Sequence, residues 1–167
     1  RLLINGLLDD GAKVAIVSGG LQQTAKDIAA QFPSSKPWSR RWGGIDRFTA
    51  GRFGEGYDSK LSVFTNGWLK GKRNSNGNYE VDDFGRYQVQ MNGKGAIVKM
   101  LQRRYGISKD KTASVGDSAG DIGMFQESAL AICFNPWDKK PLEYCDEVVE
   151  QKDLAIVLDK ITTKFSK

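Results

Sequence analysis

Two aspartates lie four residues apart at the end of a predicted apolar strand. Residues 113–124 read Ala-Ser-Val-Gly-Asp-Ser-Ala-Gly-Asp-Ile-Gly-Met and carry the carboxylates Asp117 and Asp121. Open α/β sheets bind ligands where their strands end, and a helix that begins near residue 119 would hold Asp121 in its first turn. Two converging carboxylates suit Mg²⁺, which takes oxygen ligands and keeps several waters. The alternative is an ordinary turn in which Asp117 is only a helix cap.

Four further residues have the chemistry of a phosphate-binding site. Ser18, Gly19 and Gly20 follow a short apolar strand, so their backbone amides and the serine hydroxyl could hold a phosphate beside the next helix. Lys94 opens a predicted amphipathic helix, where the macrodipole disfavours a cation and an anionic partner would offset it. Each has a plainer interpretation: Ser18 as a cap, the glycines as loop residues and Lys94 as a solvated lysine.

The elements that must position these residues alternate along the chain. The sequence predicts a helix at 2–10 and a strand at 13–17, then, after a long central segment, helices at 94–105, 120–126 and 153–164, a short helix near residue 140, and strands at 112–116, 129–133 and 146–149. Alternation of this kind predicts a parallel sheet with helices on both faces, an α/β fold.

The central segment differs from the rest of the chain in composition and in its hydrophobic pattern. Residues 53–90 are rich in Gly, Asn, Tyr and Phe, and alternation at 60–65, 68–70 and 87–90 predicts strands joined by turns such as 76–78. We expect a small antiparallel excursion here. The residues before it, 36–52, interleave Trp with Arg, a pattern that could bind nucleic acid, although a solvated loop is the favoured interpretation.

The order of these motifs resembles that of haloacid dehalogenase-type phosphatases, in particular the phosphoserine phosphatase-like branch, over most of residues 1–35 and 88–150. The resemblance implies a doubly wound, Rossmann-like parallel sheet over residues 1–167 that lacks the first strand of the family, with a β-hairpin insertion at about 46–91. It also implies a magnesium-dependent phosphomonoester hydrolase, in which Asp117 ligates Mg²⁺, Asp121 supports the metal shell, and the phosphoryl group is bound by Ser18, Gly19, Gly20 and Lys94.

One feature of that family is absent. Its nucleophile is the first aspartate of an Asp-x-Asp motif, and no such motif occurs in these residues. We therefore expect the nucleophile, which would form an aspartyl-phosphate, in an N-terminal segment or fragment upstream of Arg1. Phosphoserine or a similar small phosphorylated metabolite is the expected substrate, although Gly120 replaces an asparagine often seen in this branch. The alternative is a catalytically incomplete regulatory module that binds phosphate or metal.

The composition excludes several other chemistries. The chain has no histidine, which excludes Ser-His-Asp catalysis and histidine-containing zinc sites within it. Its two cysteines, Cys133 and Cys145, are too few for a four-thiolate site, so reduced thiols in a cytoplasmic protein are expected, with Cys133 in the core. No apolar run approaches the length of a membrane span. A net charge of +5 would attract a phosphorylated substrate.

Overall fold

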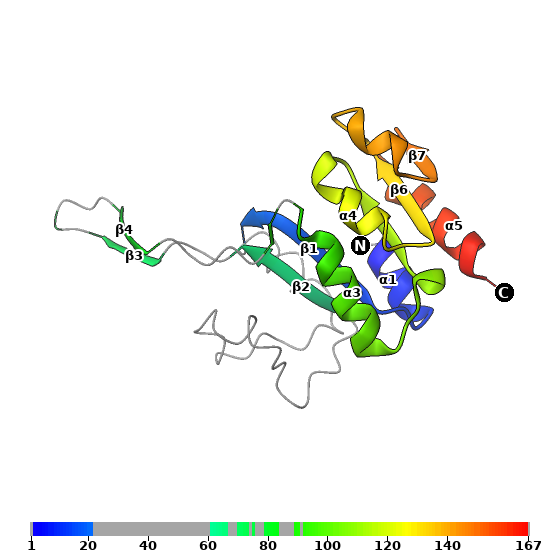
Figure 1. Ribbon diagram of the computed structural model, residues 1–167, viewed down its shortest axis with the longest axis horizontal. Coiled ribbons are helices and arrows are strands. Elements are labelled where there is room, and N and C mark those ends of the chain that lie inside the picture. Colours follow the sequence, from blue (N-terminus) through cyan, green and yellow to red (C-terminus); the bar gives the residue numbers. More distant parts are fainter. Residues whose placement is uncertain are drawn as a thin grey trace. The chain divides into compact units, whose positions relative to one another are not determined.

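The computed structural model describes residues 2–21, 61–66, 70–73, 75, 79–83, 89–90 and 92–166 (Figure 1). These residues belong to two compact units, one within Leu8–Val89 and the other comprising Leu2–Leu7 and Gln90–Lys167. The expectations for residues 36–52, and for strands that involve residues 68–69 and 87–88, lie outside the described residues.

The first unit contains a parallel pair of strands. β1 (Val14–Leu21) pairs with β2 (Leu61–Asn66), with Val14 opposite Leu61 and Ser18 opposite Thr65. We predicted a strand at 60–65 within an antiparallel excursion; the strand forms, but its parallel pairing makes that part of the prediction wrong. Parallel strands need a connection of about a dozen residues or more, and residues 22–60 are long enough to provide one.

The register of this pair shifts at the predicted phosphate-binding residues. Ser18 lies opposite Thr65, but the next paired residues are Leu21 and Asn66, so Gly19 and Gly20 are extra on the β1 side. The pairing is therefore irregular at this point, and irregularities of this kind, of which the β-bulge is one, bend the strand locally. The glycines therefore interrupt β1 near its carboxyl end.

A two-stranded hairpin follows within the same unit. β3 (Lys70–Arg73) and β4 (Tyr79–Asp83) pair in antiparallel fashion, with Arg73 opposite Tyr79. Figure 1 shows the two strands side by side. The predicted β-hairpin is confirmed; the predicted turn at 76–78 lies outside the described residues.

The second unit is built on a three-stranded parallel sheet in the order β5 (Ala113–Gly116), β6 (Leu130–Phe134) and β7 (Glu147–Val149). Between β5 and β6 the chain forms a 3₁₀ turn and the short helix α4 (Ile122–Phe125); between β6 and β7 it forms a 3₁₀ turn at Lys140–Glu143. All three strands were predicted to within two residues.

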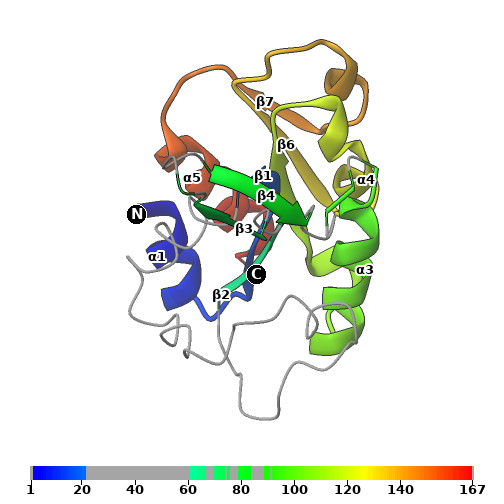
Figure 2. The ribbon, with the colours of Figure 1, turned by 90° about the vertical axis from the view of Figure 1, so that its left-hand side faces the viewer.

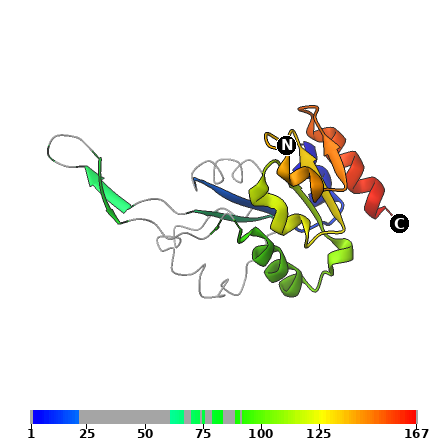
Figure 3. The same ribbon diagram turned by 45° about the horizontal axis from the view of Figure 1, so that its top comes forward.

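Helices cover both faces of this sheet, as the alternation predicted. Figure 2 shows α1 (Leu2–Asp9) and α5 (Leu154–Phe165) on one side of β6, with α3 (Lys94–Tyr105) and α4 on the other. In Figure 3, α5 (red) lies alongside β7 (orange). The α/β parallel fold is therefore confirmed.

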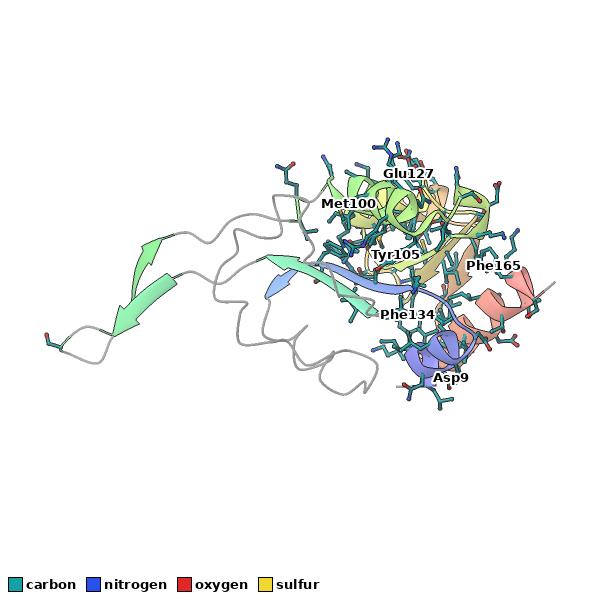
Figure 4. All side chains as sticks on the ribbon, turned by 90° about the horizontal axis from the view of Figure 1, so that it is seen from below. Asp9, Met100, Tyr105, Glu127, Phe134 and Phe165 are labelled. Atoms are coloured by element: carbon teal, nitrogen blue, oxygen red, sulfur yellow. The ribbon has the colours of Figure 1, made fainter. Side chains whose placement is uncertain are left out.

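The sheet residues divide between two apolar clusters because successive side chains of β6 point to opposite faces. One cluster is centred on Leu130, Ile132, Val149, Val157 and Ile161, against which half-buried residues of α1 and α5 pack. Phe134 and Phe165, which Figure 4 labels, are two of the half-buried residues around it. The other cluster contains Val98, Met124, Phe125, Ala131 and Cys133.

Cys133 is fully buried, as predicted, and both cysteines are free thiols. Burial, with a smaller contribution from the neighbouring Cys145 thiol, raises the pKa of Cys133 to about 12. Because the thiolate is the reactive form, Cys133 acts here as a small apolar core residue. None of the helices in the described parts of the chain has both the length and the apolar character of a membrane span.

Candidate functional site

β5 ends in a tight turn that carries the first of the two predicted carboxylates. Gly116 is the last strand residue, and Asp117 follows it at the carboxyl edge of the sheet. Ser118 then begins a capping box that closes on Asp121, the last residue of the 3₁₀ turn Ala119–Asp121. A capping box satisfies backbone N–H groups that the start of a helix leaves without partners, so this short sequence fixes both aspartates on one compact turn.

Asp121 is the most buried carboxylate of this turn, with only 2% of its surface exposed. Its Oδ1 accepts a hydrogen bond from Lys94 Nζ at 2.5 Å. Its Oδ2 accepts from the backbone N–H groups of Asp117 and Ser118 at 2.9 and 3.1 Å, and from Ser118 Oγ at 3.2 Å. Both carboxylate oxygens are therefore already engaged by groups of this chain.

Lys94 reaches Asp121 because the helices that carry the two residues lie very close together. A Cβ added to Gly95 would lie 2.5 Å from the Gly123 carbonyl oxygen, so only glycine permits this approach. A Cβ added to Gly116 would lie 2.4 Å from Asp121 Cβ. The two glycines are thus positions where the chain needs the space of a missing side chain. The Lys94 side chain keeps 15% of its surface exposed.

The two carboxylates have opposite pKa shifts. Burial alone would raise the pKa of Asp121, but the hydrogen bonds from Lys94 and from the Asp117 backbone outweigh it and hold that pKa below the ordinary value. Although Asp117 is exposed as a residue, partial burial of its carboxyl, followed by the charge of Asp121, raises its pKa above the ordinary value. Asp121 is therefore a firmly ionised partner of Lys94, whereas Asp117 is a carboxylate whose charge a nearby cation would stabilise.

A loop after β6 (residues 135–140, the β6 loop below) is tied to this turn. The backbone N–H of Trp137 donates to the Asp117 carbonyl at 3.3 Å. Asp138 Oδ2 accepts from the Ala119 N–H at 3.2 Å, and its Oδ1 accepts from the Lys140 N–H at 2.8 Å. Asp138 was not among the site residues predicted from the sequence. Its position just after a parallel strand, at the same sheet edge as Asp117, was the available signal.

The carboxylate oxygens of this turn fit a hard cation that keeps several of its water ligands. Within the described residues, no group of three or more His, Cys, Asp or Glu side chains could hold a metal ion. Mg²⁺ is typically held by one or two carboxylates, with waters and substrate phosphate oxygens as the remaining ligands. Asp117 is exposed, so its carboxylate is accessible to such a cation.

The structure brings together half of the predicted site residues. Lys94, Asp117 and Asp121 lie within the second unit, two of them joined by the ion pair and two by the bond from the Asp117 amide to Asp121. The other three lie on β1 in the first unit: Ser18, Gly19 and Gly20. Their part in the same site stays a prediction.

Comparisons with known proteins agree on one family. Residues 75–161 match the family model of haloacid dehalogenase-like hydrolases. A stretch of 75 residues is 36% identical to the phosphoserine phosphatase of Methanocaldococcus jannaschii, covering 44% of this chain and 34% of that protein. A stretch of 60 residues is 37% identical to the phosphoglycolate phosphatase of Archaeoglobus fulgidus, covering 36% of this chain and 27% of that protein.

A solved structure supports the same relationship. A phospho-aspartyl intermediate analogue of phosphoserine phosphatase matches with a TM-score of 0.65 and 26% identity, covering 94% of this chain and 60% of that one. The matches thus span about a third or less of the curated relatives and about 60% of this solved chain.

Proposed function

This chain belongs to the haloacid dehalogenase-like hydrolases, and from that membership we propose that the whole protein is a magnesium-dependent phosphomonoester hydrolase, acting on phosphoserine or a similar small phosphorylated metabolite. The observation that carries the proposal is the turn after β5. It sets one engaged carboxylate, Asp121, against the Lys94 ammonium and leaves a second carboxylate, Asp117, exposed beside them.

In this proposal, Lys94 binds the phosphoryl group. An ammonium has three N–H donors, and Asp121 takes one of them. The other two can donate to phosphoryl oxygens, on which charge is redistributed in the transition state. Asp121 then serves to orient Lys94, which differs from our first expectation that it supports the metal shell. Ser18, Gly19 and Gly20 are proposed to bind the remaining phosphoryl oxygens.

Asp117 is the proposed ligand of Mg²⁺. The pKa of its carboxyl is raised by burial and by the charge of Asp121, and a bound cation would favour the ionised form. When bound, Mg²⁺ would neutralise charge between a nucleophilic carboxylate and the phosphoryl dianion. We expect metal binding to weaken in acid, because protonation of Asp117 removes its charge.

The nucleophile is proposed to lie outside these 167 residues. They contain no Asp-x-Asp motif, and the proposal assigns Asp117 to the metal and Asp121 to Lys94. The reaction would proceed through an aspartyl-phosphate that water then hydrolyses, so that catalysis rests on positioning and charge neutralisation. From this chain, Lys94 would position the phosphoryl group and Asp117 would hold the cation that neutralises charge.

Two kinds of relative support the proposed substrate class. One is a phosphoserine phosphatase and the other a phosphoglycolate phosphatase. Both substrates in those names are small carboxylate-bearing phosphomonoesters, so a compact leaving group that carries a carboxylate is the proposed common feature. The net charge of +5 would favour encounter with such dianionic or trianionic molecules.

The proposal is tested by assaying phosphate release from phosphoserine, phosphoglycolate and p-nitrophenyl phosphate with the full-length protein. We expect turnover of at least one small carboxylate-bearing ester with Mg²⁺ and none in EDTA. Asp117→Asn should abolish it, while Asp110→Asn, which removes an exposed carboxylate elsewhere in the same unit, should not. Metal and phosphate binding without any turnover would instead support the regulatory module, and full activity in EDTA would contradict the metal assignment.

A further inference from the structure

The β6 loop makes two separate backbone ties to the turn that carries the proposed metal ligand. The Trp137 N–H donates to the Asp117 carbonyl, and the Asp138 carboxylate accepts from the Ala119 N–H. The two ties lie on either side of Ser118. Together with the bond from the Asp117 N–H to Asp121, they restrain the backbone of Asp117 both before and after its side chain.

Asp138 accepts two hydrogen bonds, one from a neighbour in the sequence and one from a residue far from it in the sequence. The bond from the Lys140 N–H spans two residues, as in a common Asx turn, and by itself would describe only the loop. The bond from the Ala119 N–H joins residues 19 apart. Ala119 is the first residue of its 3₁₀ turn, so its N–H has no acceptor within that turn and needs one from elsewhere.

From this geometry we propose that Asp138 is a positioning residue that holds the Asp117 turn in the conformation able to bind a divalent cation. The inference rests on the proposed function, because it assigns Asp138 a task only if Asp117 is a metal ligand. Asp138 itself does not contact the cation in this proposal. It acts through the Ala119 backbone, as hydrogen-bond partners of metal ligands commonly act through the ligands they orient.

Two substitutions separate positioning from charge. Asp138→Ala removes both accepted hydrogen bonds, whereas Asp138→Asn removes the charge but keeps one carbonyl oxygen as an acceptor. A matched control is Asp153→Ala, which removes an aspartate that accepts the Ala155 N–H at the start of α5. Loss of such a cap lowers stability, so this control measures the effect of destabilisation alone.

The test is a Mn²⁺ titration of the full-length protein without substrate, in which the free-ion signal is followed by electron paramagnetic resonance and thermal melts are recorded in parallel. Loss of a partner that orients a ligand typically weakens metal binding about 10- to 100-fold, so we expect Asp138→Ala to raise the Mn²⁺ dissociation constant at least about tenfold. Asp138→Asn should raise it less, and Asp153→Ala should leave it unchanged.

Two results would overturn the inference. Wild-type Mn²⁺ affinity in Asp138→Ala would show that the hydrogen bond from Ala119 is not needed. Equal weakening in Asp153→Ala and Asp138→Ala would assign the effect to destabilisation alone. If Asp138→Ala does not fold, Ala119→Pro takes its place, because it removes the N–H donor and leaves Asp138 intact. Wild-type affinity in that variant has the same meaning. Failure of the proposed function is distinct: Mn²⁺ would then bind equally well to Asp117→Asn, or not at all to the wild type, and the task of Asp138 would be lost with it.

Discussion

Replacing Asp121 by asparagine tests the ion pair on which the candidate site depends. The side chain keeps its shape and loses its charge. An amide has one acceptor oxygen, yet four donors surround the present carboxylate: Lys94 Nζ, the Asp117 and Ser118 N–H groups, and Ser118 Oγ. Whichever way the amide is turned, its NH₂ group therefore faces at least one other donor.

The better orientation keeps the oxygen on the two backbone amides and turns NH₂ toward Lys94. The ammonium then has no partner at Asp121, in a position where the lysine side chain is 15% exposed and Asp121 only 3%. Removing one member of a buried ion pair costs about 3–5 kcal/mol. Because Lys94 retains some access to water, we expect a loss of about 3 kcal/mol, out of a typical total stability of about 5–15 kcal/mol.

Urea unfolding of the full-length protein at neutral pH measures this loss. Asp159→Asn, which removes an exposed carboxylate on α5, is the control and should change the free energy of unfolding by less than about 0.5 kcal/mol. The pH dependence gives a second readout. Since the pKa of Asp121 is lowered on folding, its contribution is present above the unfolded value of about 4 and is lost as the pH falls through the folded value. The variant should lack that loss, and a variant as stable as the control would refute the ion pair.

Three further outcomes are expected. Gly116→Ala places a Cβ 2.4 Å from Asp121 Cβ, so we expect a loss of about 1–3 kcal/mol in urea unfolding together with reduced turnover, and a fully stable, active variant would contradict the close packing. Lys94→Ala should weaken inhibition by vanadate as well as slow turnover about 100- to 1,000-fold, whereas an unchanged inhibition constant would return Lys94 to a purely structural task. In metal-free protein, Asp117→Asn should raise the melting temperature at pH 7, because the raised pKa of Asp117 means that folding disfavours its charge. This gain should vanish below about pH 4, where the carboxyl is protonated in the folded and the unfolded state. A gain that persists in acid would show that the charge of Asp117 is not its cause.

Local signals predicted the elements well where each element carried its own pattern. The helix that begins at Lys94 and the turn after Gly116 were predicted at the residues where the structure has them, because apolar spacing and Gly-Asp turn chemistry are properties of neighbouring residues. The direction of β2 was not predictable in the same way. Alternation identifies a half-buried strand, but the same pattern serves parallel and antiparallel partners. The partner here is β1, whose residues lie 45 to 47 positions before those they pair with.

The sequence predicted which residues belong to the site, but not which of them form hydrogen bonds with one another. Lys94 and Asp121 are 27 residues apart, and nothing in either local pattern states that Lys94 bonds to Asp121. That contact depends on the close approach of α3 and α4 at Gly95 and Gly123. The tie from Asp138 to Ala119 is likewise a result of the sheet, which brings the ends of β5 and β6 to one edge.

The most direct test of the central claim is a crystal structure of the full-length protein with Mg²⁺ and vanadate. We expect a cation ligated by Asp117, and Lys94 Nζ within about 3 Å of both Asp121 Oδ1 and a vanadate oxygen. The opposite result would be a cation bound away from Asp117, or vanadate with no contact to Lys94. Either observation would contradict the assignment of this turn as the phosphoryl and metal site.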